Sequence, residues 1–166
     1  MSKPTRDGKF MRLALAEARK ALDEGEVPIG AVAVRRGRVV ARGHNRRNAL
    51  GDLTAHAEMM CLRDLSRREG LAKRLSDVTI YSTLEPCAMC SGAMIHHRVA
   101  RCVWGESDTL LGAAGGALDI LNRRTSRVRG KGGVLRKECR ALLLEFFEKQ
   151  LGRPATSWED IRLPNE

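Results

Sequence analysis

Two short stretches of the chain carry residues whose types and spacing could bind a metal. Thr54–Glu58 has the sequence Thr-Ala-His-Ala-Glu, and Leu84–Cys90 has the sequence Leu-Glu-Pro-Cys-Ala-Met-Cys. His56, Cys87 and Cys90 offer one imidazole and two thiolates, a ligand set that favours zinc. A structural zinc takes four protein ligands, whereas a catalytic zinc takes three and keeps a position for water, whose pKa falls toward neutrality. These residues therefore predict a catalytic zinc centre.

Glu58 lies two residues after His56 and is not needed as a ligand, so we expect it to move protons in the reaction. Two other interpretations compete with this one. A Cys-x-x-Cys pair alone could be a redox couple, and a closed structural site would arise with a fourth ligand from Cys61, Cys102 or Cys139. The occurrence of both motifs in this order, with Pro86 directly before the first cysteine, favours the catalytic site.

Geometry limits where His56 and Glu58 can lie. Residues two apart point in different directions on a regular helix, so the two side chains can converge only where a helix begins. We predict this helix from about residue 56 to residue 68, with Thr54 as its N-cap.

Cys87 and Cys90 are three residues apart and therefore share one face of a second helix, predicted from residue 87 to about residue 97. Pro86 suits the first position of that helix, and a helix N-terminus stabilises thiolates. We expect backbone groups of Glu85 and Pro86, beside the metal, to stabilise the oxyanion of the reaction. The two motifs thus predict two helices whose N-termini face one zinc ion.

Hydrophobic periodicity places further elements around these two helices. We predict helices over 8–24 and 135–151, and strands over 31–34, 38–45, 78–84 and 101–105. Residues 46–53 are expected to form a polar loop, and Gly112 is expected to open a short helix that ends near Leu121. The alternation of helices with about five strands predicts an α/β fold, a three-layer α/β/α domain with a mixed sheet flanked by helices.

Length and composition indicate one domain over residues 1–166, with a core over about 8–150 and a tail over 152–166. No apolar run is long enough to span a membrane, and the five cysteines do not form a secreted disulfide framework. We therefore expect a cytoplasmic location and no contact with a membrane.

The net charge is +10, and residues 122–140 carry eight Arg or Lys against one acid. This excess of positive charge favours a polyanionic partner, unless the charged side chains only form a solvated surface.

Several longer stretches together resemble a known family. They are Glu26–Val32, Thr54–Glu58, Thr83–Ile95, Gly112–Gly116 and Leu142–Phe147. The His-x-Glu and Pro-Cys-x-x-Cys motifs are those of zinc-dependent base deaminases in general. With the Gly-Ala-Ala-Gly segment and the Phe-Phe helix added, the chain from about residue 10 to residue 150 resembles the bacterial tRNA adenosine deaminases of the cytidine deaminase superfamily.

This resemblance implies a cytidine deaminase-like fold and a hydrolytic deamination that converts the wobble adenosine of a tRNA anticodon to inosine, with release of ammonia. It implies that one zinc ion per subunit is held by His56, Cys87 and Cys90. It further implies that Glu58 is the proton shuttle and that Asn45 contacts the base or the ribose. The implied partners are the anticodon arm of a tRNA and a second copy of the chain, in a homodimer whose partner subunit helps to build the substrate groove.

The chain also departs from that family. Asp52-Leu53 and Asp108-Thr-Leu stand where the family commonly has Asp-Pro and Asp-Pro-Lys. The tail, Arg153–Ile161, is similar to that of fungal-type cytosine deaminases, in which a Trp and an Asp close over a free base. Trp158 and Asp160 could form such a lid, or Trp158 could only anchor the tail on the core.

These departures keep two other functions open. The first is deamination of a small free base or nucleoside, of the cytosine, isocytosine or guanine type, with the tail as its lid. The second is a non-catalytic, zinc-stabilised RNA-binding module, against which the intact Glu58 argues.

Overall fold

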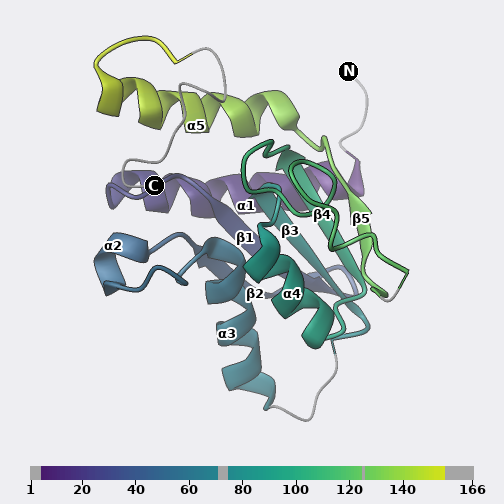
Figure 1. The fold of residues 1–166 in the computed structure, drawn as a ribbon. Coiled ribbons are helices and arrows are strands. Elements are labelled where there is room, and N and C mark those ends of the chain that lie inside the picture. Colours follow the sequence, from purple (N-terminus) through teal and green to yellow (C-terminus); the bar gives the residue numbers. More distant parts are fainter. Residues whose placement is uncertain (1–4, 71–74, 125, 156–166) are drawn as a thin grey trace.

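A computed structural model describes residues 5–70, 75–124 and 126–155. A five-stranded sheet, in the order β2-β1-β3-β4-β5, forms the centre of this structure (Figure 1). Its strands are β1 (Gly30–Arg35), β2 (Arg38–His44), β3 (Val78–Leu84), β4 (Arg101–Glu106) and β5 (Arg129–Lys131). Pairing is antiparallel from β2 through β1 to β3 and parallel from β3 through β4 to β5, so the mixed sheet is confirmed.

Helices cover both faces of this sheet. They are α1 (Arg6–Asp23), α2 (Arg47–Leu50), α3 (Ala57–Glu69), α4 (Ala88–His96) and α5 (Arg136–Leu151). Figure 1 shows α1 and α5 on one side of the strands and α3 and α4 on the other, which confirms the three-layer α/β/α architecture. None of the helices in the described residues combines the length and hydropathy needed to cross a bilayer.

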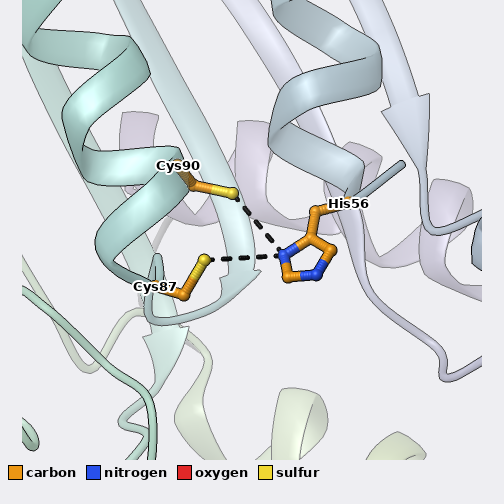
Figure 2. A group of neighbouring side chains, drawn as sticks. All are labelled: His56, Cys87 and Cys90. Carbon is orange, nitrogen blue, oxygen red and sulfur yellow. Dashed lines mark hydrogen bonds between the residues drawn. The ribbon is translucent and has the colours of Figure 1, made fainter. Parts of the chain in front are cut away.

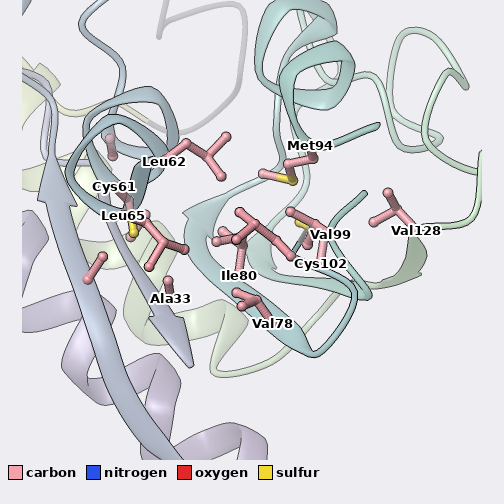
Figure 3. Close-up of a cluster of buried hydrophobic side chains, with 14 of the residues drawn as sticks. Ala33, Cys61, Leu62, Leu65, Val78, Ile80, Met94, Val99, Cys102 and Val128 are labelled. Atoms are coloured by element: carbon pink, nitrogen blue, oxygen red, sulfur yellow. The ribbon is translucent and has the colours of Figure 1, made fainter. Parts of the chain in front are cut away.

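Alternation along β1 divides the core between the two faces. Ala31 and Ala33 belong to the cluster under α3 and α4, whereas Val32 and Val34 pack with Phe10 of α1 on the opposite face. Side chains of a strand point alternately to the two sides, so one apolar strand serves two cores. The first cluster is shown in Figure 3, where Leu62 and Leu65 of α3 and Met94 of α4 meet Val78, Ile80 and Cys102 of the sheet.

Two glycines allow the helices to lie directly on the strands. A Cβ atom at Gly30 would lie 2.1 Å from the carbonyl oxygen of Ala14 in α1. A Cβ atom at Gly43 would lie 2.5 Å from the carbonyl oxygen of Ala57 in α3. Both distances are far inside van der Waals contact, so these positions exclude any side chain. The close contact at Gly43 holds the start of α3, which bears one of the two metal-binding motifs.

Three local predictions were wrong. Thr54 is not the N-cap of α3, because its backbone and hydroxyl groups both donate to the carboxylate of Asp52, and the N-cap is His56 itself. Pro86 is not inside α4, whose N-cap is Cys87. The loop predicted over 46–53 contains the short helix α2.

The short helix predicted from Gly112 to Leu121 does not form. This segment consists of turns with two isolated bridges, Cys87 to Gly112 and Ala114 to Asp119. The amides of Ala114 and Gly116 bond to the carboxylate of Glu85, and that of Ala113 bonds to the carbonyl of Pro86, so they are not available for a helical ladder. Several other amides of the segment bond within it, in turns.

Candidate active site

His56, Cys87 and Cys90 point toward one another from the starts of two helices (Figure 2). The Nδ1 atom of His56 lies 3.6 Å from the sulfur of Cys87 and 3.7 Å from the sulfur of Cys90. With zinc–nitrogen bonds of about 2.0 Å and zinc–sulfur bonds of about 2.3 Å, the nitrogen–sulfur edge of a tetrahedron is about 3.5 Å. The three side chains are thus positioned to bind a metal ion, and their chemistry and spacing fit zinc.

No fourth His, Cys, Asp or Glu completes this group in the part of the chain that the structure describes. The three other cysteines lie in the core, and burial raises the pKa of each thiol. They are Cys61, Cys102 and Cys139. The described residues therefore do not supply the closed four-ligand site, and a metal ion held by these three side chains would keep a coordination position for water.

The two cysteines of the motif differ in their electrostatic surroundings. A hydrogen bond from Cys90, together with His56, lowers the pKa of the Cys87 thiol to about 4. The same hydrogen bond, together with burial, raises the pKa of Cys90. Hydrogen bonding with Cys87 raises the pKa of His56, whereas the nearby guanidinium of Arg47 acts in the opposite direction. The site thus carries a thiolate at neutral pH, the form that binds metals.

Glu58 occupies the second position of α3 and is only 3% exposed. The hydroxyl of Ser82 donates to one oxygen of its carboxylate at 3.2 Å, and the sulfur of Cys90 lies 3.6 Å from the other oxygen. Burial raises the pKa of Glu58, which makes the carboxyl a better proton acceptor. His56 is the N-cap with extended backbone, and both His56 and Glu58 lie within 3.7 Å of the Cys90 sulfur and line one cavity. The predicted convergence at a helix start is therefore observed.

A cavity adjoins these residues. Its polar lining includes Asn45, Arg47, His56, Glu58 and Asp108. Its apolar lining consists of Val27, Ile29, Leu84 and Leu111. Asn45 therefore lies where a ligand in this cavity would touch it, and its contact with a base or ribose stays a prediction.

Two residues of this region escaped the sequence analysis. Glu26 is buried, accepts a hydrogen bond from the backbone of Ala49 at 2.8 Å, and lies 3.5 Å from the amide nitrogen of Asn45. Arg47 lines the cavity itself. The only sequence signal for Glu26 was its place in the Glu26–Val32 stretch, and Arg47 lay in a segment predicted as polar loop.

Glu85 holds the loop over 108–116 at the rim of the site. Its carboxylate accepts hydrogen bonds from the backbone amides of Asp108, Ala114 and Gly116 at 2.8–3.0 Å. Its own N–H donates to the carbonyl of Glu106 at 2.9 Å, and Pro86 has no N–H to offer. The stabilisation of an oxyanion by backbone groups of these two residues stays a prediction.

Trp158 and Asp160 lie outside the residues that the structure describes, so their predicted role as a lid stays a prediction.

Comparison with known proteins matches residues 4–106 to the cytidine and deoxycytidylate deaminase zinc-binding region. The tRNA-specific adenosine deaminase of Bacillus subtilis (strain 168) is 40% identical over 147 residues, which cover 87% of this chain and 91% of that protein. The chloroplastic tRNA(adenine(34)) deaminase of Arabidopsis thaliana is 41% identical over 162 residues, and the chain spans only 12% of that longer protein.

A solved structure from studies of A-to-I editing by tRNA:A34 deaminases superposes with a TM-score of 0.76. It is 39% identical in sequence, and the superposition covers 81% of this chain and 98% of the other. Fold, metal-binding residues and sequence agree, and the chain therefore belongs to the zinc-dependent cytidine and deoxycytidylate deaminase family, in its tRNA-specific adenosine deaminase branch.

Proposed function

We propose that this protein deaminates the wobble adenosine of a tRNA anticodon to inosine. The observation that carries the proposal is the joint presence of a three-ligand metal site and a buried Glu58 beside it, in a chain that matches tRNA-specific adenosine deaminases over most of its length. Zinc bound by His56, Cys87 and Cys90 supplies an acidified water as the nucleophile.

Glu58 moves the protons of the reaction. It accepts one proton of the attacking water and delivers it to a ring nitrogen of the adenine. It then takes the proton that remains on the added hydroxyl and gives it to the amine, which leaves as ammonia. Burial suits this task, since a raised pKa makes the carboxylate a better proton acceptor. The hydrogen bond from Ser82 holds the carboxylate in one orientation between these transfers.

The cavity walls suit a flipped base. An adenine inside an RNA loop has to leave its stack before the amine-bearing carbon can reach the metal. The apolar lining from Val27, Ile29, Leu84 and Leu111 offers flat packing for the ring. Asn45, whose amide nitrogen lies near Glu26, is placed to hydrogen-bond the base or ribose.

A homodimer in the cytoplasm completes the proposal. Leu50 at the end of α2 and Leu53 after it are exposed, as are Leu110 and Leu111 in the 108–116 loop and Leu118 just after that loop. Arg47 of α2 and Leu111 of the loop line the cavity, so both segments border it. A partner subunit would cover these side chains, which are costly to leave in water. All five cysteines are free thiols, as the reducing cytoplasm requires. Light scattering coupled to size exclusion should give twice the mass of the chain, and a monomeric mass would contradict the dimer.

Ammonia release tests the proposed substrate. Zinc-loaded protein is incubated with an anticodon stem-loop that carries a wobble adenosine, and separately with a panel of free bases and nucleosides. We expect inosine to form in the stem-loop, at a rate that falls as salt rises because phosphate contacts are screened. Release from a free base alone would favour the alternative substrate, and release from neither substrate would favour the RNA-binding module.

A further inference from the structure

Arg47 is the cation of the active-site cavity, and its guanidinium has no partner in the described structure. It is the first residue of α2 and lines the same cavity as His56 and Glu58. Its Nε atom is buried and makes no hydrogen bond. Within the described residues, no carboxylate lies within ion-pair distance of this side chain.

The acids around Arg47 are engaged elsewhere. Glu26 accepts the amide of Ala49, and one oxygen of Asp108 accepts the backbone amides of Leu110 and Leu111 at 2.9 and 3.0 Å. Arg47 as a whole is half-buried, but a buried polar atom without a partner is costly. An arginine kept in this state next to a metal site indicates that its counter-ion arrives with the ligand.

The neighbouring Arg46 shares the buried Nε atom without a hydrogen bond but differs in two other respects. Its Nε atom lies 3.4 Å from the carboxylate of Glu24 in an ion pair, and its side chain lines a different depression beside β2. The two arginines are adjacent in sequence but differ in their surroundings. Arg46 therefore serves as a matched control for Arg47.

We propose that Arg47 binds a backbone phosphate that flanks the target adenosine and thereby selects a polynucleotide over a free base. The inference rests on the proposed function, since it assumes that the base enters as part of an RNA. A guanidinium matches a phosphate with paired N–H donors, and such charge-assisted hydrogen bonds are among the strong ones. A free base carries no phosphate, so its binding would leave the arginine unpaired.

The first test compares Arg47→Gln with Arg46→Gln on the anticodon stem-loop. Loss of one charge-assisted hydrogen bond corresponds to a rise in KM of about tenfold or more. We expect this rise for Arg47→Gln, with kcat and zinc content close to those of the unchanged protein. The slope of log KM against log salt should also fall by about one. Arg46→Gln should resemble the unchanged protein, and equal KM values for the two variants would overturn the inference.

The second test replaces the phosphates on either side of the adenosine, one at a time, by an uncharged methylphosphonate. One replacement should raise the KM of the unchanged protein as much as Arg47→Gln does. The same replacement should add nothing further in the Arg47→Gln variant, because both changes remove one contact. If the Arg47→Gln substitution and the methylphosphonate together raise KM by the product of their separate effects, Arg47 does not contact that phosphate.

The two proposals can fail separately. If the unchanged protein forms inosine in the stem-loop and Arg47→Gln does so equally well, only the phosphate contact is wrong. If the unchanged protein releases ammonia from a free base and not from the stem-loop, the proposed function fails and the phosphate contact fails with it.

Discussion

Glu58 and the three metal-binding side chains are close together, and the proposed function gives them separable tasks. His56, Cys87 and Cys90 converge on one point, whereas Glu58 contacts Ser82 and only one of the two sulfurs. A side chain that moves protons without holding the metal can be removed while the metal stays. Removal of a metal ligand should abolish both metal binding and activity.

Replacement of Glu58 by alanine tests the first half of this argument. We expect Glu58→Ala to keep its zinc and its fold, because none of the three ligands is changed, and to lose turnover by a factor of about 10² to 10⁴. Zinc is measured by atomic absorption and turnover by inosine formation. Turnover equal to that of the unchanged protein would refute the assignment of Glu58 as the proton shuttle.

Replacement of Cys87 by alanine tests the second half. Cys87→Ala should lose both zinc and activity, because two remaining ligands are too few for a stable site. Cys102→Ala is the control, since Cys102 is equally a cysteine but lies in the core cluster away from the metal group. Full zinc occupancy in Cys87→Ala, or loss of zinc in Cys102→Ala, would contradict the ligand set.

At the scale of elements, the loop over 108–116 takes its shape from one buried carboxylate. Glu85 accepts three backbone amides of this loop, and Gly112 packs so closely that a Cβ atom there would lie 2.6 Å from the carboxyl carbon of Glu85. The loop supplies Asp108 and Leu111 to the cavity. The shape of the cavity therefore depends on how tightly this loop packs against Glu85.

Gly112→Ala should disturb this packing. We expect it to lower the free energy of unfolding by about 1–3 kcal/mol and to raise KM, because the loop has to move outward. Zinc content should not change.

Gly92→Ala is the control. Gly92 lies inside α4, and a Cβ atom there would have no neighbouring heavy atom within 4 Å. Alanine should therefore stabilise the protein by about 0.5–1 kcal/mol. Chemical unfolding measures the free energy of unfolding of both variants. Equal changes in that free energy would contradict the predicted effect of Gly112→Ala.

At the scale of the whole molecule, Asp7 joins the first helix to three strands. Its carboxylate accepts two hydrogen bonds from Arg101 of β4 at 2.7 and 2.8 Å. It also accepts from Tyr81 of β3 and from Lys131 of β5, each at 3.0 Å. The hydrogen bonds from Arg101, Lys131 and Tyr81 hold the pKa of Asp7 well below its usual range.

This lowered pKa predicts how stability changes with pH. A carboxyl whose pKa is lower in the folded than in the unfolded state stabilises the protein above its unfolded pKa of about 4, and the contribution is lost as pH falls. Asp7→Asn should therefore be less stable than the unchanged protein at neutral pH and should lose less stability on acidification. Urea unfolding across this pH range measures both effects. Asp64→Asn, which breaks the exposed ion pair with Arg68 on α3, should change stability little. If Asp7→Asn and the unchanged protein lose stability in parallel, Asp7 does not carry the effect.

Metal removal should also lower the thermal stability of the whole protein. The ligands come from α3 and α4, so a bound ion links two helices that otherwise meet through apolar side chains. We expect a chelator to lower Tm and added zinc to restore it, because a ligand that binds only the folded state stabilises it. Cys87→Ala should show a Tm that is insensitive to both additions. If the chelator removes the zinc but leaves the Tm of the unchanged protein as it was, the metal does not stabilise the contact between α3 and α4.

The sequence by itself determined the metal ligands, the pair of helix starts that present them, the positions of the four longer strands and the layered fold. These features are local: ligand spacing, periodicity and helix geometry each depend on residues a few positions apart. For this reason the convergence of His56 and Glu58 at a helix start follows from their spacing alone. The tail with Trp158 and Asp160 stays a prediction.

Only the tertiary structure decided the features that depend on segments far apart in the chain. β5 has three exposed residues without alternation and exists because it pairs with β4. The segment from Gly112 forms turns rather than a helix, and Glu85 binds the amides of Ala114 and Gly116 there. Arg47 has no ion pair among the described residues. Hydrogen bonds between distant segments leave no periodic trace in the sequence, so these residues could be recognised only once the chain was folded.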